Sequence, residues 1–251
     1  RAVIAYSNLI KRHFKATRPI ILGGIEASLR RVSHYDFWQN KIRRSILFDA
    51  KADALVYGMG ETTILQIAHA LAHQEPLDQI RGLCYISPAP VADYHLLPSH
   101  HQVAKDHQAF TDMFDTFYRN NDPLNAEGLC QLQDTRYLVQ NPPAYHLTQT
   151  ELDNVYALDF EYEQHPYYAQ WGAVKLLETI RFSVSTHRGC YGECNFCAIA
   201  VHEGRAIRWR SPQSLESEVK KLTTLPGFKG IIHDISAPTA NMYGFECKKK
   251  L

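Results

Sequence analysis

No stretch of this sequence approaches the roughly 20 consecutive apolar residues of a membrane-spanning helix, and no secretory leader opens it. Excess charge of one sign is also missing, because 27 basic residues face 26 acidic ones and the formal net charge is +1. This balance gives no indication of a nucleic-acid-binding surface. Internal repeats and low-complexity tracts are absent as well. We therefore expect a globular cytoplasmic protein without a membrane segment, and nucleic acid is not indicated as a partner.

Cysteine is scarce, with six residues in 251, and their spacing is not that of a disulfide framework. Cys190, Cys194 and Cys197 form a C-x3-C-x2-C run, and the other three are isolated. Three local thiols are one fewer than the four that close a [4Fe–4S] cluster or a structural zinc site. The run therefore predicts a [4Fe–4S] cluster with one iron open to a further ligand. A structural zinc site is the alternative.

The segments around the cysteines predict a strand, a loop, a helix and a second strand. Residues 180–185 alternate apolar and polar side chains, and residues 230–235 form another short β-favouring run. Between them, Ser211 and Pro212 are typical of a helix start, and Pro226 marks the helix end. This order places the cysteine loop at the carboxyl end of the first strand, where parallel α/β barrels build their active sites.

The N-terminal third predicts the later part of a doubly wound α/β domain. Apolar strands at 19–24, 53–57 and 82–86 alternate with amphipathic helices, the pattern of a parallel sheet covered on both faces. Glycines follow the first two strands, at 23–24 and 58–60. Ligands bind at such positions in doubly wound sheets, but glycines there also turn the chain from strand to helix, and we prefer this second interpretation.

We divide the chain into three parts. Residues 1–88 form the N-terminal doubly wound α/β domain without its beginning, 89–178 a helical or irregular connector, and 179–251 the first βαβ unit of a barrel. A barrel of about six such units, at roughly 30 residues each, needs more residues than follow Cys197. We therefore expect a truncated chain that is inactive on its own.

Several segments resemble the YgiQ family of radical S-adenosylmethionine (SAM) proteins, the UPF0313 group. They are Gly23–Arg31, His34–Asp36, Lys51–Asp53, Thr186–Gly192 with Phe196 before the last cysteine, and His233–Asn241. The resemblance covers essentially the whole chain. It implies a cobalamin-binding-like parallel sheet domain followed by the start of a radical SAM partial (β/α) barrel. Where the family has two glycines before Pro238, this chain has Ser236 and Ala237, whose Cβ atoms narrow the space beside the second strand.

The resemblance also implies an activity. Cys190, Cys194 and Cys197 would bind three irons of the cluster, and SAM would bind the fourth. The implied reaction is reductive cleavage of SAM to a 5′-deoxyadenosyl radical by a radical SAM enzyme. The implied partners are a one-electron donor such as a flavodoxin or ferredoxin and a substrate that the sequence does not identify. The alternative is a zinc-stabilised α/β binding module without redox activity.

Candidates for the SAM pocket are Phe196, His202, His233, Asp234 and Pro238. Phe196 lies within the cysteine run and His202 close behind it, whereas His233 and Asp234 are expected at the carboxyl end of the second strand. In the absence of SAM, either His187 or His202 is expected to cap the fourth iron.

The remaining cysteines, and the pair His69 and His73, lie outside the predicted cluster site. Cys84 and Cys130 are predicted not to bind the cluster, because one lies in an apolar strand and the other has no neighbouring thiol. Cys247 is interpreted either as the first cysteine of a second cluster or as a lone thiol. His69 and His73 share a helix face but give a weak metal signal without a carboxylate.

Two further patterns are interpreted as having no ligand. Arg30–Arg31 and Arg43–Arg44 suit an anionic substrate or RNA, but we favour solvated helix faces. The segment Asp93–Pro98 has proline where the signature of a cobalt-ligating histidine has glycine, and it follows the last strand of the domain. The sequence therefore predicts that the N-terminal domain does not bind cobalamin.

Overall fold

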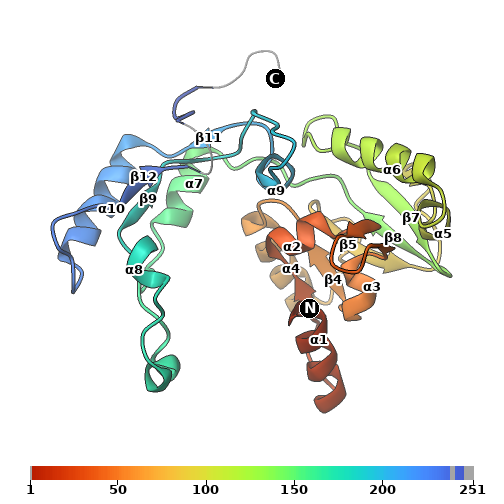
Figure 1. Ribbon diagram of the computed structural model, residues 1–251, viewed down its shortest axis with the longest axis horizontal. Helices are drawn as coiled ribbons and strands as arrows, with labels where there is room; N and C mark the ends of the chain where they lie inside the picture. The colour runs from red at the N-terminus through yellow and green to blue at the C-terminus, as the bar shows by residue number, and fades with distance from the viewer. Residues whose placement is uncertain (1, 238–240, 246–251) are drawn as a thin grey trace. The chain divides into compact units, whose positions relative to one another are not determined.

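The computed structural model describes residues 2–237 and 241–245, and these divide into two compact units (Figure 1). The first unit comprises the chain up to Tyr145 together with Val201–Gly204, and the second comprises His146–Ala200 and the chain from Arg205 onward. Each unit has its own core of buried apolar side chains. The longest helices have 13 residues, and in the described part of the chain none is long and apolar enough to span a membrane.

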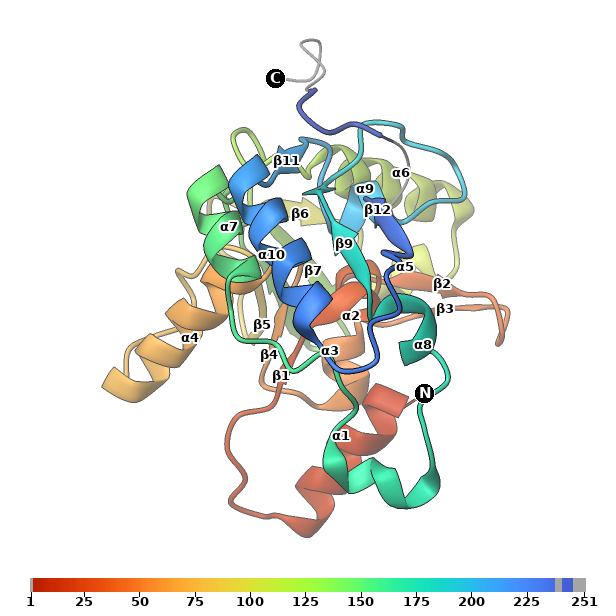
Figure 2. The same cartoon turned by 90° about the vertical axis from the view of Figure 1, so that its left-hand side faces the viewer.

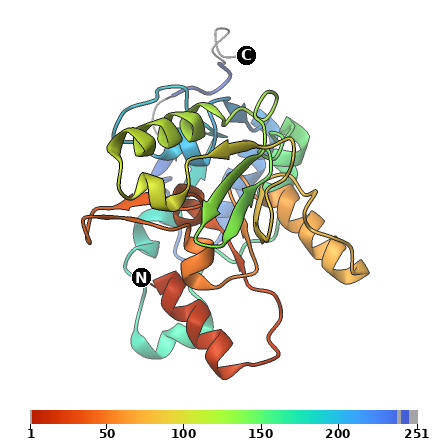
Figure 3. The ribbon, with the colours of Figure 1, turned by 90° about the vertical axis from the view of Figure 1, so that its right-hand side faces the viewer.

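A six-stranded mixed sheet forms the centre of the first unit (Figure 3). Its strands lie in the order β1 (Ile21–Leu22), β4 (Ala54–Val56), β5 (Leu83–Ser87), β8 (Arg136–Gln140), β7 (Leu129–Gln133) and β6 (His95–Leu97). The outer pairs β1–β4 and β6–β7 are parallel, whereas the three central pairs are antiparallel. Leu55, Leu83 and Val139 on the central strands are fully buried, as expected for strands covered on both faces.

The predicted α/β fold is confirmed, with a correction to the direction of one strand. β1 and β4 are parallel and each is followed by a helix, as the sequence indicates. The third predicted strand, β5, runs antiparallel to β4, with Leu55 opposite Cys84. The physical reason is that a continuous apolar run indicates a strand buried on both faces but contains no information about the direction of that strand.

Six helices and one hairpin complete the described part of the first unit. The helices are α1 (Ala2–His13), α2 (Gly24–Leu29), α3 (Ile46–Ala50), α4 (Glu61–His73), α5 (His100–Val103) and α6 (His107–Arg119), and the hairpin joins β2 (His34–Asp36) to β3 (Lys41–Arg43). α6 begins after Asp106, whose carboxylate accepts the N–H of Gln108 at 2.8 Å. It buries Met113 and Phe117 in the core.

The range 89–178, predicted to be one connector, is divided between the two units. Its first part supplies β6, β7 and β8 to the sheet. β7 is not predicted from the sequence because it carries Gln131 and Gln133 at buried positions, and these glutamines break the expected apolar pattern. Their side chains bond the backbone N–H groups of Ser33 and Ser45, so the polar atoms are satisfied inside the core.

The second unit contains the predicted βαβ arrangement (Figure 2). β9 (Ser183–Ser185) pairs in parallel with β12 (Asp234–Ser236), and α10 (Pro212–Thr224) lies between them in the chain. The Ser211 hydroxyl caps α10 by accepting the N–H of Ser214 at 3.1 Å. The other elements that begin after Tyr145 are α7 (Gln149–Tyr156), the 3-10 helix η1 (Pro166–Trp171), α8 (Leu177–Ile180), β10 (His187–Arg188), α9 (Ile199–His202) and β11 (Arg208–Trp209).

Candidate metal centre

The three clustered cysteines lie in a tight loop that follows β9 and β10. The left-handed backbone at Gly189 (φ 85°) and Glu193 (φ 48°) turns this loop twice. The Cys190 side chain is buried, Cys194 is exposed and Cys197 is partly exposed. The N–H of Cys197 donates to the carbonyl of Cys194 at 2.9 Å, which closes the second half of the loop.

Two of the three thiols face the same small space beside Gly192. A Cβ at Gly192 would lie 3.3 Å from Sγ of Cys190 and 3.8 Å from Sγ of Cys194. The backbone N–H of Gly192 also donates to Sγ of Cys190 at 3.3 Å. A side chain at position 192 would therefore fill the space between the two sulfurs, and hydrogen bonds of this kind tune sulfur ligands of iron–sulfur clusters.

The loop supplies three thiols, a ligand set that suits a multi-iron cluster. Within the described residues, no three His, Cys, Asp or Glu side chains are grouped closely enough to hold one metal ion. A single zinc with Zn–S bonds of about 2.3 Å needs its sulfurs about 3.8 Å apart. A cluster makes no such demand, because each thiolate binds its own iron. Three thiols within eight residues, with space between two of them, fit the cluster that the sequence predicts.

A cavity of about 480 Å³ lies within the second unit, at the carboxyl ends of β9 and β12. This is the edge at which the sequence places the site. Ser236 and Ala237, which stand in place of the family's two glycines, both contribute to its wall. Its lining residues are Thr186, His187, Leu215, Ile235, Ser236, Ala237, Asn241 and Tyr243.

His187 is buried in the wall of this cavity, with only 2% of its surface exposed. Its Nδ1 lies 2.8 Å from the hydroxyl of Thr186, and that hydroxyl donates to the carbonyl of Ser236 at 3.3 Å. Because the Thr186 proton is directed at the carbonyl, we assign Nδ1 of His187 as the donor to Thr186. Nε2 of His187 then carries a lone pair.

Arg210 is a site residue that the sequence analysis missed. Its guanidinium is fully buried, forms an ion pair with Glu218 and lies over the ring of Tyr156 at 4.1 Å. It also donates to the carbonyl of Ser185 at 3.0 Å, while its backbone N–H bonds the carbonyl of Thr186 at 3.0 Å. Arg210 therefore fixes the chain that leads into the cysteine loop. No motif in the sequence predicts that Arg210 fixes this segment, because an arginine before a helix cap is normally exposed.

Of the predicted SAM-pocket residues in the second unit, the three that the structure describes do not line the cavity at the carboxyl ends of β9 and β12. Phe196 is 92% exposed. His233 precedes β12 and Asp234 is its first residue, so both lie at the amino end of the strand, and the expected place at the carboxyl end is corrected for both. His233 lines a separate cavity of about 620 Å³ with Arg181 and Phe182. Asp234 is exposed and accepts the Ser236 hydroxyl at 2.7 Å. Pro238 lies outside the described residues, as does Cys247.

His202, the remaining candidate, belongs to the first unit. Its Nδ1 lies 2.8 Å from the hydroxyl of Ser28, and the same oxygen accepts the N–H of Gly58 at 3.0 Å. Gly58 has φ 72°, and a Cβ at Gly60 would approach Val56 to 2.8 Å. Chain conformation and packing thus explain these two glycines, in keeping with the preferred interpretation of them as turn residues.

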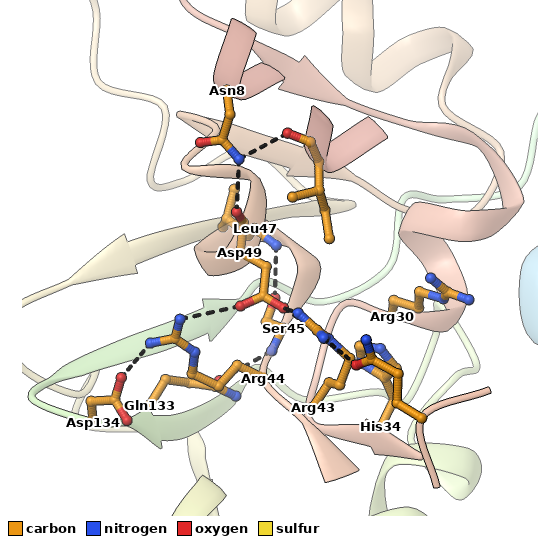
Figure 4. A network of polar contacts seen from close by, with 12 residues as sticks. Asn8, Arg30, His34, Arg43, Arg44, Ser45, Leu47, Asp49, Gln133 and Asp134 are labelled. Atoms are coloured by element: carbon orange, nitrogen blue, oxygen red, sulfur yellow. Dashed lines mark hydrogen bonds and ion pairs between the residues drawn. The ribbon is translucent and has the colours of Figure 1, made fainter. Parts of the chain in front are cut away.

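Three of these four arginines of the first unit form ion pairs with carboxylates, and Figure 4 shows those of Arg43 and Arg44. Asp49 accepts Arg43 at 2.5 Å and Arg44 at 3.2 Å, and Arg44 also pairs with Asp134. Arg30 pairs with Glu26 at 2.7 Å. The interpretation as solvated helix faces is wrong for Arg43 and Arg44, because Arg43 ends β3 and Arg44 follows it, whereas Arg30 caps α2. Arginines paired with carboxylates are poorly suited to attracting an anion.

Arg31 differs from the other arginines because it is fully buried. It lies between the rings of Tyr57 and Phe117, at 4.3 and 4.2 Å from their centres. Burial lowers the pKa of its guanidinium. It donates to Gln140 at 2.8 Å and to the carbonyl of Ser28 at 2.5 Å. Its role is in the core of the first unit and not in steering an anion.

The isolated cysteines Cys84 and Cys130 are both buried, in β5 and β7 of the six-stranded sheet. Burial raises the pKa of Cys84 to about 12 and also raises the pKa of Cys130. Metal ligation requires the thiolate. Their environment therefore favours the neutral thiol over the ligand form.

Comparison with known proteins gives a family profile and several relatives. The profile of the Radical SAM N-terminal family matches residues 1–183. A UPF0313 protein of Fusobacterium nucleatum is 55% identical, and UPF0313 proteins of Clostridium botulinum and Thermotoga neapolitana are each 44% identical. The alignments cover 100%, 99% and 98% of this chain but 44%, 39% and 44% of the relatives. The chain thus spans less than half of the length of these relatives.

Among solved structures, the chain is similar to TsrM from Kitasatospora setae, a radical SAM methyltransferase. The complex with tryptophan and a SAM analogue has a TM-score of 0.47 and 16% identity, over 93% of this chain and 32% of that chain. The complex with cobalamin and a [4Fe–4S] cluster has a TM-score of 0.46 and 16% identity, over 88% and 31%.

Proposed function

The chain belongs to the Radical SAM N-terminal family, in its UPF0313 group, and from this premise we propose that it is part of a radical SAM enzyme. In this proposal the loop Cys190–Cys197 holds a [4Fe–4S] cluster, and SAM binds the iron that has no thiolate. The observation that carries the proposal is the space beside Gly192, which two of the three sulfurs face. The substrate is unidentified.

Cys190, Cys194 and Cys197 would each bind one iron through a thiolate. A reduced cluster with SAM bound would supply the electron that cleaves SAM to methionine and a 5′-deoxyadenosyl radical. A one-electron donor such as a flavodoxin or ferredoxin is the proposed partner. As in other cofactor enzymes, the protein would position the reactants and exclude water around a cofactor that carries the chemistry.

The chain's own residues have definable tasks around this loop. The N–H of Gly192 donates to the Cys190 sulfur, a hydrogen bond of the kind that tunes sulfur ligands of clusters. Arg205 pairs with Glu193 at 2.5 Å and so fixes the residue between Gly192 and Cys194. Arg210 holds the chain that enters the loop.

The cavity at the carboxyl ends of β9 and β12 is the proposed place for part of the SAM molecule. Its wall combines polar Asn241 and Tyr243 with apolar Leu215 and Ile235. This mixture suits a ligand with polar ends and an apolar centre. The hydroxyl of Tyr243 is held by donating to the carbonyl of Arg210 at 2.8 Å, so this wall is fixed in place.

The test is anaerobic reconstitution with iron and sulfide, followed by iron counting and visible absorption spectroscopy. We expect about four irons per chain and a brown protein with sulfur-to-iron charge-transfer bands. Cys194→Ala should lose the cluster, because two thiolates do not hold it. A colourless protein that binds about one zinc would refute the proposal and support the zinc-stabilised binding module.

The catalytic half of the proposal needs a separate measurement on a longer chain. The Fusobacterium nucleatum relative, 55% identical to this chain, offers such a protein. Incubated anaerobically with SAM and a reductant, it should produce 5′-deoxyadenosine. If the reconstituted relative holds the cluster but yields no 5′-deoxyadenosine, the proposed enzymatic activity is refuted. The proposed metal site is unaffected by that result.

A further inference from the structure

Two exposed histidines form a close pair near the carboxyl end of α4. His69 and His73 are one helical turn apart, while α4 buries Thr63, Ile67 and Ala70. Their ring centres are 4.1 Å apart, with 26° between the ring planes. Two imidazoles bound to one ion at about 2.1 Å place their ring centres about 4.5 to 5 Å apart. The rings are stacked at a spacing slightly shorter than that of a chelate, so both exposed rings must rotate for their Nε2 atoms to meet at one ion.

The contacts of the Nδ1 atoms leave the Nε2 atoms available to a metal. Nδ1 of His73 lies 2.8 Å from the carbonyl oxygen of His69, so it must be the protonated nitrogen. Nδ1 of His69 faces a carboxylate oxygen of Glu75 at 3.6 Å. This distance is longer than a hydrogen bond. A carbonyl or carboxylate on the second nitrogen is the usual outer shell of a metal-binding histidine.

The end of the helix holds Glu75 in place. Gln74 adopts the left-handed conformation with φ 58°, and its N–H and that of Glu75 both donate to the carbonyl of Ala70. Glu75 therefore follows the helix at a fixed position. A carboxylate partner for the pair could not be predicted from the sequence, because Glu75 is brought beside His69 only by this cap geometry.

Electrostatics at this end of α4 favour a cation. The carboxyl end of a 13-residue helix carries a partial negative charge from its last carbonyl groups. Glu75 adds a full negative charge beside His69. The side chain of His69 is 64% exposed, so water has free access to an ion at this place.

From this arrangement we infer that His69 and His73 form a two-histidine site for a divalent transition-metal ion such as Cu²⁺, Ni²⁺ or Zn²⁺. Both Nε2 atoms bind the ion, Glu75 orients His69, and water completes the coordination shell. Water is required because no three metal-ligating side chains of the described residues are grouped around one ion. Imidazole ligands select these ions over Mg²⁺ and Ca²⁺, which prefer oxygen. The site is independent of the proposed cluster.

Isothermal titration calorimetry with Ni²⁺ tests this inference, on protein whose cysteines have been alkylated so that the thiols do not compete. With both histidines present, the alkylated protein should bind one Ni²⁺ per chain. It should bind Cu²⁺ more tightly, following the usual order of affinity among divalent transition metals. Glu75→Gln should weaken binding by about tenfold, as removal of outer-shell carboxylates does. His69→Ala and His73→Ala should each weaken it further. Electron paramagnetic resonance (EPR) of bound Cu²⁺ should show coupling to two ring nitrogens, and to one fewer in each variant.

The matched control is His107→Ala, which removes an exposed histidine from the start of α6. It should leave the affinity for Ni²⁺ unchanged. Equal Ni²⁺ binding by the wild type and the double variant His69→Ala/His73→Ala would overturn the site. So would tight binding of Mg²⁺ that depends on the same two residues. Circular dichroism of each variant verifies that α4 is still folded.

Discussion

The hydroxyl oxygen of Ser28 lies 2.8 Å from Nδ1 of His202, although 174 residues separate the two in the chain. Ser28 is fully buried, and its oxygen also accepts the N–H of Gly58. A hydroxyl that accepts the backbone proton has its own proton to donate, and we assign it to Nδ1 of His202. Asn121 adds a contact at 3.4 Å to the carbonyl of Val201. These bonds hold Val201 and His202, which follow the cysteine loop in the chain, within the first unit.

The Ser28–His202 contact predicts a measurable coupling in stability. Ser28→Ala should lower the free energy of unfolding by about 1–3 kcal/mol, because it leaves the part-buried N–H of Gly58 without its acceptor. A double-mutant cycle with His202→Ala should give a coupling energy of about 0.5–3 kcal/mol in urea unfolding. Thr111→Ala, on the exposed surface of α6, serves as the control. Strictly additive effects would show that the two residues do not touch in solution.

The fold could be predicted from the sequence where the determining signals are local. Ser211 and Pro212 mark the start of α10, and the alternating run before Thr186 marks β9, so the βαβ unit is confirmed. The direction of β5 and the presence of β7 in the six-stranded sheet depend on pairing between distant segments. The pattern of apolar residues does not encode this pairing. The buried Gln131 is satisfied by a bond to Ser33, nearly 100 residues away.

The space beside Gly192 predicts that even a methyl group there interferes with the metal centre. In Gly192→Ala the new Cβ lies 3.3 Å from the Cys190 sulfur, tighter than an ordinary contact. We expect the iron content after reconstitution to fall well below that of the wild type. Gly23→Ala is the matched control, because Gly23 has an extended backbone and open space around its Cα. Full iron content in Gly192→Ala would show that the sulfurs bind their metal away from this space.

The ion pair between Arg210 and Glu218 predicts a large loss of stability when only one partner is removed. The side chains are 1% and 9% exposed, so Arg210→Met leaves a buried carboxylate without its partner. The expected cost is about 3–5 kcal/mol in urea unfolding. Arg210→Met/Glu218→Gln should recover part of it. A single variant as stable as the wild type would contradict the buried pairing.

The same Arg210 variants test the link to the cysteine loop. Arg210→Lys keeps the charge but does not bond Ser185, Ser214 and Glu218 together, since it lacks the planar fork. If Arg210 fixes the chain entering the loop, Arg210→Lys should reduce iron content even where the protein remains folded by circular dichroism. Unchanged iron content in a folded variant would limit Arg210 to a structural role.

The environments of Cys84 and Cys130 predict that neither contributes to the metal centre. Replacing both with alanine should leave iron content unchanged after reconstitution. Each change removes one buried sulfur from the sheet, so we expect a loss of about 1 kcal/mol or somewhat more in stability. Cys194→Ala in parallel should abolish iron binding with little effect on stability, because Cys194 is exposed. Loss of about one cluster in the double variant would refute the assignment.

The candidate site was predictable from the sequence only in part. The cysteine spacing located the loop, and the βαβ order located the edge of the sheet. His233 was expected at that edge because the second strand was assigned as 230–235, whereas the structure has Asp234–Ser236. A shift of a few residues in a short strand moves a side chain from one end to the other. Arg210 and Thr186 could not be found, because their roles arise from backbone carbonyls that lie close only in the folded chain.

The hydrogen bonds of His187 and His202 predict which of the two caps the open iron when SAM is absent. We assign a lone pair to Nε2 of His187, which lines the cavity at the carboxyl ends of β9 and β12, and a proton to Nε2 of His202. A neutral imidazole binds iron through the nitrogen that carries the lone pair, so this assignment favours His187. His187→Ala should therefore change the EPR spectrum of the reduced, reconstituted cluster, whereas His202→Ala should leave it unchanged. Adding SAM should bring the wild type and His187→Ala to the same spectrum, because SAM replaces the imidazole. A change in His202→Ala alone would reverse the assignment, and identical spectra in all three proteins without SAM would show that neither histidine reaches the iron.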